Sequence, residues 1–140
     1  MRQNQKTHAY GPHLLLDCYG ADSDKLADVG LVFRFLDKLP ELIGMQKIGP
    51  PQIAKFDDPK IAGVTGIVMI VTSHISIHTY ALKKCFFMDV FSCQEFDRKA
   101  VEKHTRTTFG VTHMESRLVS RGKKFPVENF LRQIQKKRQS

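Results

Sequence analysis

The sequence lacks any long hydrophobic run. Its apolar stretches reach about six residues at most, whereas a helix needs roughly 20 apolar residues to cross a bilayer. Residues 1–6 also lack the apolar core of a signal peptide. These absences argue against a membrane or secreted protein, so we expect a cytoplasmic protein with no membrane partner.

Cysteine is scarce. The three cysteines cannot all pair with one another, and no two of them form a Cys-x-x-Cys pattern. Free cysteine is usually buried, so we expect Cys18 and Cys85 to be packing residues. Cys93 is different because its neighbours indicate a function, as described below.

Net positive charge is absent from the body of the chain, although the whole chain carries +8. Residues 121–140 contain seven Lys or Arg and one Glu, and Arg2 and Lys6 supply the rest, so residues 7–120 are neutral. A nucleic-acid-binding protein would carry a basic stripe on the fold itself. We therefore expect the basic tail to be a solvated charge run and predict no nucleic-acid partner. A nucleic-acid-binding module remains an alternative, for which binding would weaken with salt.

The apolar pattern predicts one domain of the α+β class. A chain of 140 residues with 41% hydrophobic content suffices for one core but not for two ordinary domains. We expect a domain over residues 1–125 and a basic tail over residues 126–140, in which apolar residues recur at helical spacing. Links of hairpin length favour a two-layer sandwich, an antiparallel sheet with helices on one face.

Local patterns place the elements of this fold. Asp22 and Asp97 offer capping oxygens for two helices, the first carrying Leu26, Val29, Phe33 and Leu36. Glycine and proline predict turns at residues 49–51 and 56–59. Strand patterns cover residues 13–19, 66–71, 74–80, 85–93 and 114–119.

Residues 72–80 join an apolar run to a strictly alternating one. Gly66–Val71 is typical of a buried strand, and Ile75 and Ile77 then alternate with polar residues, as in a strand with one functional face. Ser73 is therefore expected at a break between two strands.

This segment and three others resemble the prokaryotic S-adenosylmethionine decarboxylase proenzymes. The family's Ser-His-hydrophobic-x-Ile-His-Thr core matches residues 73–79, and its Asp-hydrophobic-Phe-x-Cys strand matches residues 89–93. Its Gly-Val-Ser-Gly turn is similar to residues 63–66, and its first strand to residues 13–20. The resemblance runs from about His13 to Gly122.

The resemblance implies a pyruvoyl-dependent decarboxylase of S-adenosylmethionine in polyamine (spermidine) biosynthesis. The chain would cleave itself between Thr72 and Ser73 when the serine attacks the Thr72 carbonyl, and the resulting ester would eliminate and hydrolyse to a pyruvoyl group on Ser73. This cofactor would form a Schiff base with the substrate amine and take up the electrons left when CO2 departs. Resemblance also implies a homodimer in which sheets or sheet edges of two copies meet.

The same resemblance assigns roles to other residues. Cys93 would return a proton to the substrate, which suits a thiol with an ordinary pKa near 8.5. His78 would move protons during self-cleavage, and the Thr65 hydroxyl would support that step. Thr72 supplies the attacked carbonyl and stands where the family usually has Glu.

Substrate binding is assigned to Tyr80, which can stack on adenine, and to Asp17 and Asp89, which can hold a cationic substrate or form salt bridges. The family's Trp-Pro-Glu is replaced by Tyr80-Ala81-Leu82, which removes a glutamate that helps hold the nucleoside. Ornithine or arginine therefore remains an alternative substrate. A catalytically silent homologue that partners an active enzyme is a further alternative.

A metal site at His74, His78 and Cys93 is the rival interpretation of these residues. Strand positions four apart are separated by about 13 Å, too far for two zinc bonds of about 2 Å each. We therefore predict no metal.

Overall fold

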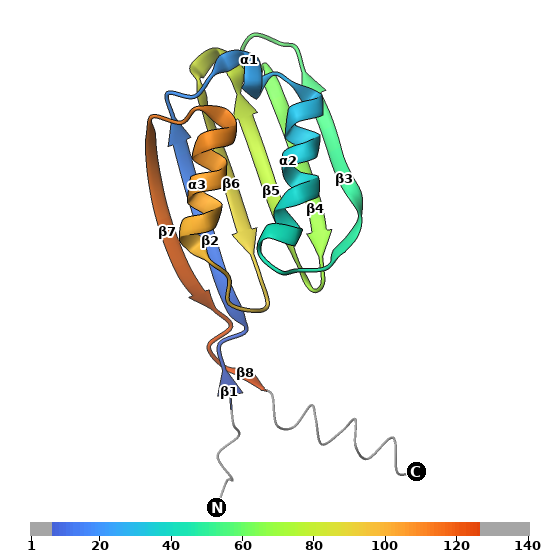
Figure 1. The fold of residues 1–140 in the computed structure, drawn as a ribbon, viewed down its shortest axis with the longest axis vertical. Helices are drawn as coiled ribbons and strands as arrows, with labels where there is room; N and C mark the ends of the chain where they lie inside the picture. The colour runs from blue at the N-terminus through green and yellow to red at the C-terminus, as the bar shows by residue number, and fades with distance from the viewer. Residues whose placement is uncertain (1–6, 127–140) are drawn as a thin grey trace, which may run out of the picture.

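A six-stranded antiparallel sheet forms one layer of the fold, and helices α2 (Val29–Leu42) and α3 (Arg98–Phe109) cover one of its faces (Figure 1). This computed structural model describes residues 7–126; the apolar tail residues beyond Pro126 lie outside them. The predicted α+β two-layer sandwich is confirmed. In spatial order the strands are β3 (Lys47–Phe56), β4 (Gly63–Ile70), β5 (Ser73–Tyr80), β6 (Cys85–Phe91), β2 (Gly11–Tyr19) and β7 (His113–Arg121).

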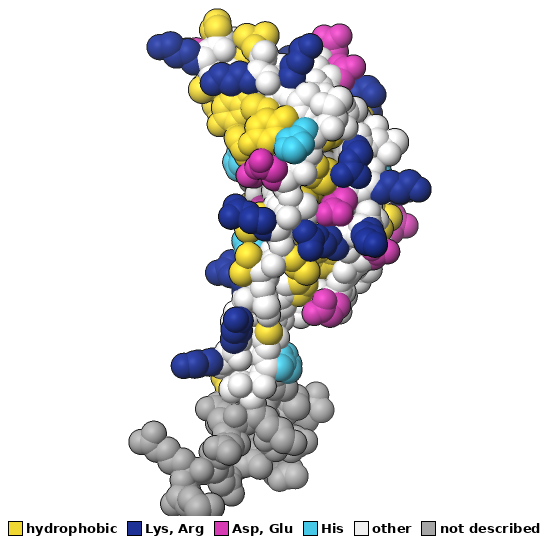
Figure 2. Space-filling model, turned by 90° about the vertical axis from the view of Figure 1, so that its left-hand side faces the viewer, with side chains coloured by type: hydrophobic (Ala, Val, Ile, Leu, Met, Phe, Trp, Pro, Cys, Tyr) yellow, Lys and Arg dark blue, Asp and Glu magenta, His cyan; other side chains and the backbone are white. Residues whose placement is uncertain are grey.

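No helix within residues 7–126 covers the opposite face of the sheet, which is called the open face below (Figure 1). Alternation along the strands places polar residues there together with exposed apolar ones. None of the helices within residues 7–126 has the length and apolar character needed to span a membrane. Figure 2 views the β7 edge, where basic and acidic side chains are interspersed, consistent with a neutral body. Exposed apolar residues of this open face include Ile48, Ile67, Met69, Phe87 and Val119, which are 40–51% exposed.

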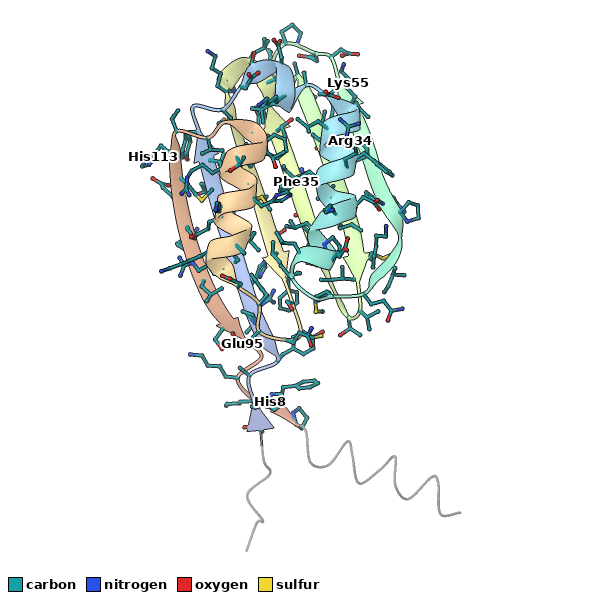
Figure 3. The ribbon with its side chains drawn as sticks, in the orientation of Figure 1. His8, Arg34, Phe35, Lys55, Glu95 and His113 are labelled. Carbon is teal, nitrogen blue, oxygen red and sulfur yellow. The ribbon has the colours of Figure 1, made fainter. Side chains whose placement is uncertain are left out.

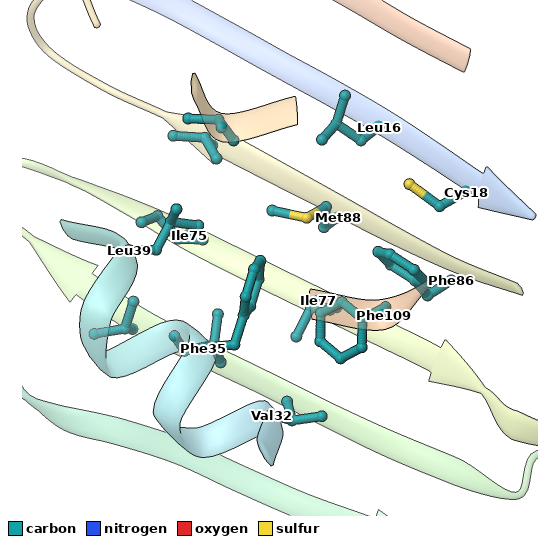
Figure 4. Close-up of a cluster of buried hydrophobic side chains, with 14 of the residues drawn as sticks. Leu16, Cys18, Val32, Phe35, Leu39, Ile75, Ile77, Phe86, Met88 and Phe109 are labelled. Carbon is teal, nitrogen blue, oxygen red and sulfur yellow. The ribbon is translucent and has the colours of Figure 1, made fainter. Parts of the chain in front are cut away.

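The core fills the space between the sheet and the helices. Phe35 of α2 reaches toward α3 (Figure 3), where its ring stacks on His104 at 5.4 Å and meets Phe109 edge-on at 4.9 Å. Cys18 is fully buried as predicted, and burial raises the pKa of its thiol to about 12. Complete burial of one such aliphatic or aromatic side chain stabilises the fold by about 1.5–3 kcal/mol. The strand residues in this cluster include Leu16, Cys18, Ile75, Ile77, Phe86 and Met88 (Figure 4).

The first helical region is two helices instead of the single one predicted. Asp22 caps the short α1 (Ser23–Leu26), and Asp28 then caps α2 by accepting from the Leu31 amide at 3.1 Å. A second N-cap restarts the helix in a new phase. Of the four apolar residues assigned above to one helix, Leu26 and Leu36 are buried, whereas Val29 and Phe33 are exposed.

The turn predicted at residues 49–51 lies inside strand β3. Proline lacks an amide N–H, so it interrupts a central strand but is tolerated at a sheet edge. β3 is an edge strand, which among the described strands pairs with β4 alone, and its register shifts between Ile48 and Gln52, where the prolines lie. The turn at residues 56–59 does follow the strand.

A two-stranded ribbon extends from the lower end of the sheet in Figure 1. It pairs β1 (Thr7–His8) with β8 (Phe125–Pro126), so Pro126, assigned above to the tail, is bonded to the segment before β2. The Tyr10 amide extends this pairing by donating to the Gly122 carbonyl at 3.0 Å. The ribbon thereby holds the segments before β2 and after β7 together, beside the turn between β4 and β5. The 3-10 helix η1 (Ala81–Lys83) joins β5 to β6 at the opposite end.

Candidate active site

Ser73 is the first residue of β5, and its hydroxyl is buried. The Oγ atom has no hydrogen-bond partner within residues 7–126. Burying an unpaired hydroxyl costs roughly 1–3 kcal/mol, so a serine with only a structural role would normally be bonded. An unpaired hydroxyl beside a peptide carbonyl can act as a nucleophile, which is the role that the sequence predicts for Ser73.

Side chains from distant segments hold the backbone that precedes Ser73. The Tyr10 hydroxyl donates to the Thr72 carbonyl at 2.7 Å and also contacts the Thr72 hydroxyl. The Cys93 thiol lies 3.4 Å from the Val71 carbonyl oxygen. Because β6 runs antiparallel to β5, the residues that follow its last strand residue return to the start of β5. The structure therefore brings Cys93 to residues 71–73, which are called the Ser73 junction below.

His78 and Thr65 form a second group toward the other end of β5. They are register partners, and the Thr65 hydroxyl lies 3.2 Å from His78 Nδ1. Five residues along a strand span about 16 Å, so within one copy of the chain this pair is remote from Ser73. Tyr80 lies still farther along β5, with its ring centroid 6.1 Å from that of Phe87.

Asp89 lies at the centre of the open face in a network that the sequence did not indicate. It accepts a hydrogen bond from Ser76, lies 2.7 Å from His13 Nε2 and lies 3.5 Å from His74 Nε2. Burial alone would raise the pKa of the Asp89 carboxyl, but the bonds from Ser76 and His13, with nearby His74, hold it below the ordinary value. Asp89 is therefore an anion at neutral pH.

The proton positions on His13 follow from its two neighbours. The Arg121 guanidinium can only donate and lies 3.2 Å from His13 Nδ1, so Nδ1 accepts and Nε2–H donates to Asp89. His13, His74 and Asp89 offer ligand atoms within 4.8 Å of one another, a set distinct from the one considered from sequence. A divalent cation there would face the Arg121 charge. The arrangement thus favours a hydrogen-bonded network over a metal site.

Two hollows flank these groups. A cavity of about 300 Å³ adjoins the junction and is lined by Tyr10 and Cys93. Glu95 at the lower end of the sheet and His8 on the ribbon below it, both labelled in Figure 3, also line this cavity. The second, of about 240 Å³, is an open groove across the sheet face. Its lining includes three of the residues singled out from sequence, His78, Asp17 and Asp89, whereas Tyr80 is not among them.

Tyr10, His13 and Arg121 were not found by sequence reasoning. Tyr10 acts on a carbonyl 62 residues away, and no local pattern indicates such a contact. His13 was counted only as the start of a strand, and Arg121 only as part of the basic tail. The contacts of His13 with Asp89 and with Arg121 depend on β2 lying between β6 and β7 in the sheet.

Comparisons with known proteins agree with this geometry. Residues 12–122 match the model of the S-adenosylmethionine decarboxylase family. The chain is 32% identical over 93 residues to an S-adenosylmethionine decarboxylase proenzyme of Archaeoglobus fulgidus, covering 66% of this chain and 78% of that one. A Clostridium botulinum proenzyme of the same name is 28% identical over 114 residues, covering 81% and 95%. The crystal structure of adenosylmethionine decarboxylase from Aquifex aeolicus superposes with a TM-score of 0.70 at 27% identity, covering 82% of this chain and 92% of that one.

Proposed function

This chain belongs to the S-adenosylmethionine decarboxylase family, and from that premise we propose that it is a pyruvoyl-dependent decarboxylase of S-adenosylmethionine in polyamine biosynthesis. The observation that carries the proposal is the buried, unbonded Ser73 hydroxyl at the start of β5. It supports self-cleavage between Thr72 and Ser73.

Self-cleavage requires only groups of the chain itself and water. Ser73 Oγ bonds to the Thr72 carbonyl carbon, the bond from that carbon to the Ser73 nitrogen breaks, and the nitrogen takes the hydroxyl proton. The resulting ester loses the Ser73 Cα proton and expels the Thr72 carboxylate, leaving dehydroalanine. Water then replaces the nitrogen, ammonia leaves, and residue 73 ends as a pyruvoyl group.

The pyruvoyl carbonyl supplies an electron sink for the decarboxylation of an amino acid. Cys93, which adjoins the junction, is the proposed acid that returns a proton to the substrate Cα. Asp89 and Asp17 line the groove on the open face and are proposed to hold cationic groups of the substrate, with Tyr80 available for stacking. The ionised state of Asp89 suits that role.

We further propose that the active form is a homodimer. Within one copy, His78 lies about 16 Å from Ser73 along β5, and Thr65 is the register partner of His78 on β4, so both are too far from Ser73 to assist its cleavage. If two open faces meet around a two-fold axis near the middle of β5, the His78 end of one copy lies opposite the Ser73 end of the other. The exposed apolar residues of that face, such as Ile67 and Met69, would then be covered.

Mixed dimers test this arrangement. Cys93→Ala and His78→Ala chains should each be nearly inactive alone, because every site lacks one group. Co-expression should restore activity, since one site of each mixed dimer receives Cys93 from one chain and His78 from the other. Activity that stays at the level of the separate variants would contradict a shared site.

The substrate is tested by measuring CO2 release from S-adenosylmethionine, ornithine and arginine, with Ser73→Ala as the inactive control. Release from S-adenosylmethionine alone supports the proposal. One observation favours ornithine or arginine as a second candidate: Leu82, where the family has its glutamate, is 68% exposed and offers no carboxylate. Release from either of those substrates alone would move the assignment to it. If wild-type chain stays uncleaved and releases no CO2, the chain is a silent homologue.

A further inference from the structure

We propose that the Tyr10 hydroxyl is the oxyanion donor for self-cleavage, and hence a catalytic residue that precedes the family-matching region. That region begins at residue 12. The inference rests on the proposed function, because it concerns the carbonyl that Ser73 would attack. Its basis is the hydrogen bond of 2.7 Å from the Tyr10 hydroxyl to the Thr72 carbonyl oxygen.

The direction of this hydrogen bond is fixed by chemistry. A carbonyl oxygen only accepts, so the phenol proton of Tyr10 points at the Thr72 oxygen. The contact between the Tyr10 and Thr72 hydroxyls must then be donated by Thr72, because Tyr10 has a single proton. The result is a short chain of bonds from the Thr72 hydroxyl through Tyr10 to the Thr72 carbonyl. Such chains polarise one another and strengthen the terminal donor.

The bond gains strength as the reaction proceeds. When Ser73 Oγ bonds to the Thr72 carbon, the carbonyl electron pair moves onto the oxygen, which becomes negatively charged. A hydrogen bond to a charged oxygen is roughly twice as strong as one to a neutral oxygen. When the electron pair returns, the bond to the Ser73 nitrogen breaks and the nitrogen takes the proton. Tyr10 therefore stabilises the intermediate more than the starting peptide, which is the requirement for catalysis.

Tyr10 is held in position before the reaction begins. Its amide donates to Gly122, its ring meets Phe125 edge-on at 5.2 Å, and it lies 5.5 Å from the ring of Phe91. Gly122 has φ +65°, and a Cβ there would lie 2.6 Å from the Tyr10 Cβ, so this position requires glycine. Pairing of β1 with β8 thus helps to hold the Tyr10 hydroxyl at the junction.

Substituting Tyr10 with phenylalanine tests the donor directly, because Tyr10→Phe removes the hydroxyl and keeps the ring contacts. The chain is synthesised in a short translation pulse, and the uncleaved fraction is followed over time on a denaturing gel. Removing one oxyanion donor typically costs 10²–10³-fold in rate, so we expect cleavage slower by about 10²-fold. The uncleaved chain should resist hydroxylamine, which cuts esters, because this variant stalls before the ester forms.

Two further variants separate the donor from other roles of this segment. Tyr19→Phe removes an exposed phenol from the other end of β2 and should cleave at the wild-type rate. Thr72→Val removes the side-chain hydroxyl but leaves the attacked carbonyl and its bond to Tyr10, so it should slow cleavage much less than Tyr10→Phe. Thermal unfolding of each substitution in a Ser73→Ala background, which stays uncut, checks that the fold is retained.

The outcomes are distinct. Wild-type cleavage by Tyr10→Phe would remove Tyr10 from the mechanism and leave the proposed function intact. A loss in Thr72→Val as large as that in Tyr10→Phe would also overturn the inference, because the side-chain contact would then be the one that matters. Wild-type chain that remains as uncut as Ser73→Ala would instead refute the proposed function.

Discussion

Replacing Asp89 with asparagine should destabilise the fold, because this carboxylate organises the open face. Asp89 accepts from Ser76 and from His13, and His74 adds a third polar contact. The asparagine side chain keeps one acceptor oxygen for His13, and Ser76 can turn its hydroxyl to accept from the NH2 group. Both hydrogen bonds then join neutral groups, so the charge assistance of each one is lost.

The magnitude follows from these contacts. A hydrogen bond to a charged group contributes about 1.5–3 kcal/mol, and the site is largely shielded, since the Asp89 side chain is 20% exposed and that of His13 13%. We expect Asp89→Asn to lower the free energy of unfolding by about 2 kcal/mol. For a chain of this length, that corresponds to a fall in Tm of roughly 6–8 °C.

The assay is thermal unfolding at neutral pH in a Ser73→Ala background, which keeps every chain uncut. Asp17→Asn is the matched control, because Asp17 lies on the same face and has no hydrogen-bond partner within the described residues; it should lose no more than about 0.5 kcal/mol. Since the pKa of Asp89 is lowered in the fold, its contribution is present above the ordinary value of 3.8 and is lost as pH falls through the folded value. The gap between Asp89→Asn and its reference should therefore shrink in acid. A loss below 0.5 kcal/mol at neutral pH, or a gap that widens in acid, would refute the reasoning.

Three other perturbations have defined outcomes. Cys93→Ala should still be cleaved at Ser73 but lose about 10²–10⁴-fold in turnover, as expected for removal of a positioned acid. His78→Ala should instead remain as uncleaved chain or ester. A cleaved Cys93→Ala protein with near-normal turnover would exclude the thiol as the proton donor. Deleting residues 127–140 should leave turnover largely intact, since the charge of the tail does not specify the fold; loss of activity in a folded, processed protein would place the tail in the site. Iodoacetamide at pH 8 should modify Cys93 of the native protein and spare Cys18, because burial raises the pKa of the Cys18 thiol to about 12. Peptide mapping identifies the modified residues, and labelling of Cys18 in the native protein would contradict its burial.

Much of the fold follows from local patterns. Alternation of Ile75 and Ile77 with polar residues places β5, because a strand has side chains on alternate faces and one face is buried. Asp97 marks the start of α3 by accepting from the Ala100 amide at 3.1 Å. Strand β3 could not be predicted in this way, because its prolines indicate a turn and only its place at the sheet edge makes them tolerable.

The candidate site was predictable only in part. The four motifs indicated the family, which is confirmed, and antiparallel pairing of β5 with β6 explains why Ser73 and Cys93 meet. His78 is close to Ser73 in sequence, yet an extended strand carries it about 16 Å away. Tyr10 and the network around Asp89 arise from contacts between residues far apart in sequence, for which periodicity carries no information.

Denaturing mass spectrometry of the purified protein tests the central claim most directly. The account predicts two chains, residues 1–72 ending in a free carboxylate and residues 73–140 beginning with a pyruvoyl group, while Ser73→Ala stays whole. A fully intact chain of 16.0 kDa that nevertheless decarboxylates S-adenosylmethionine would contradict it.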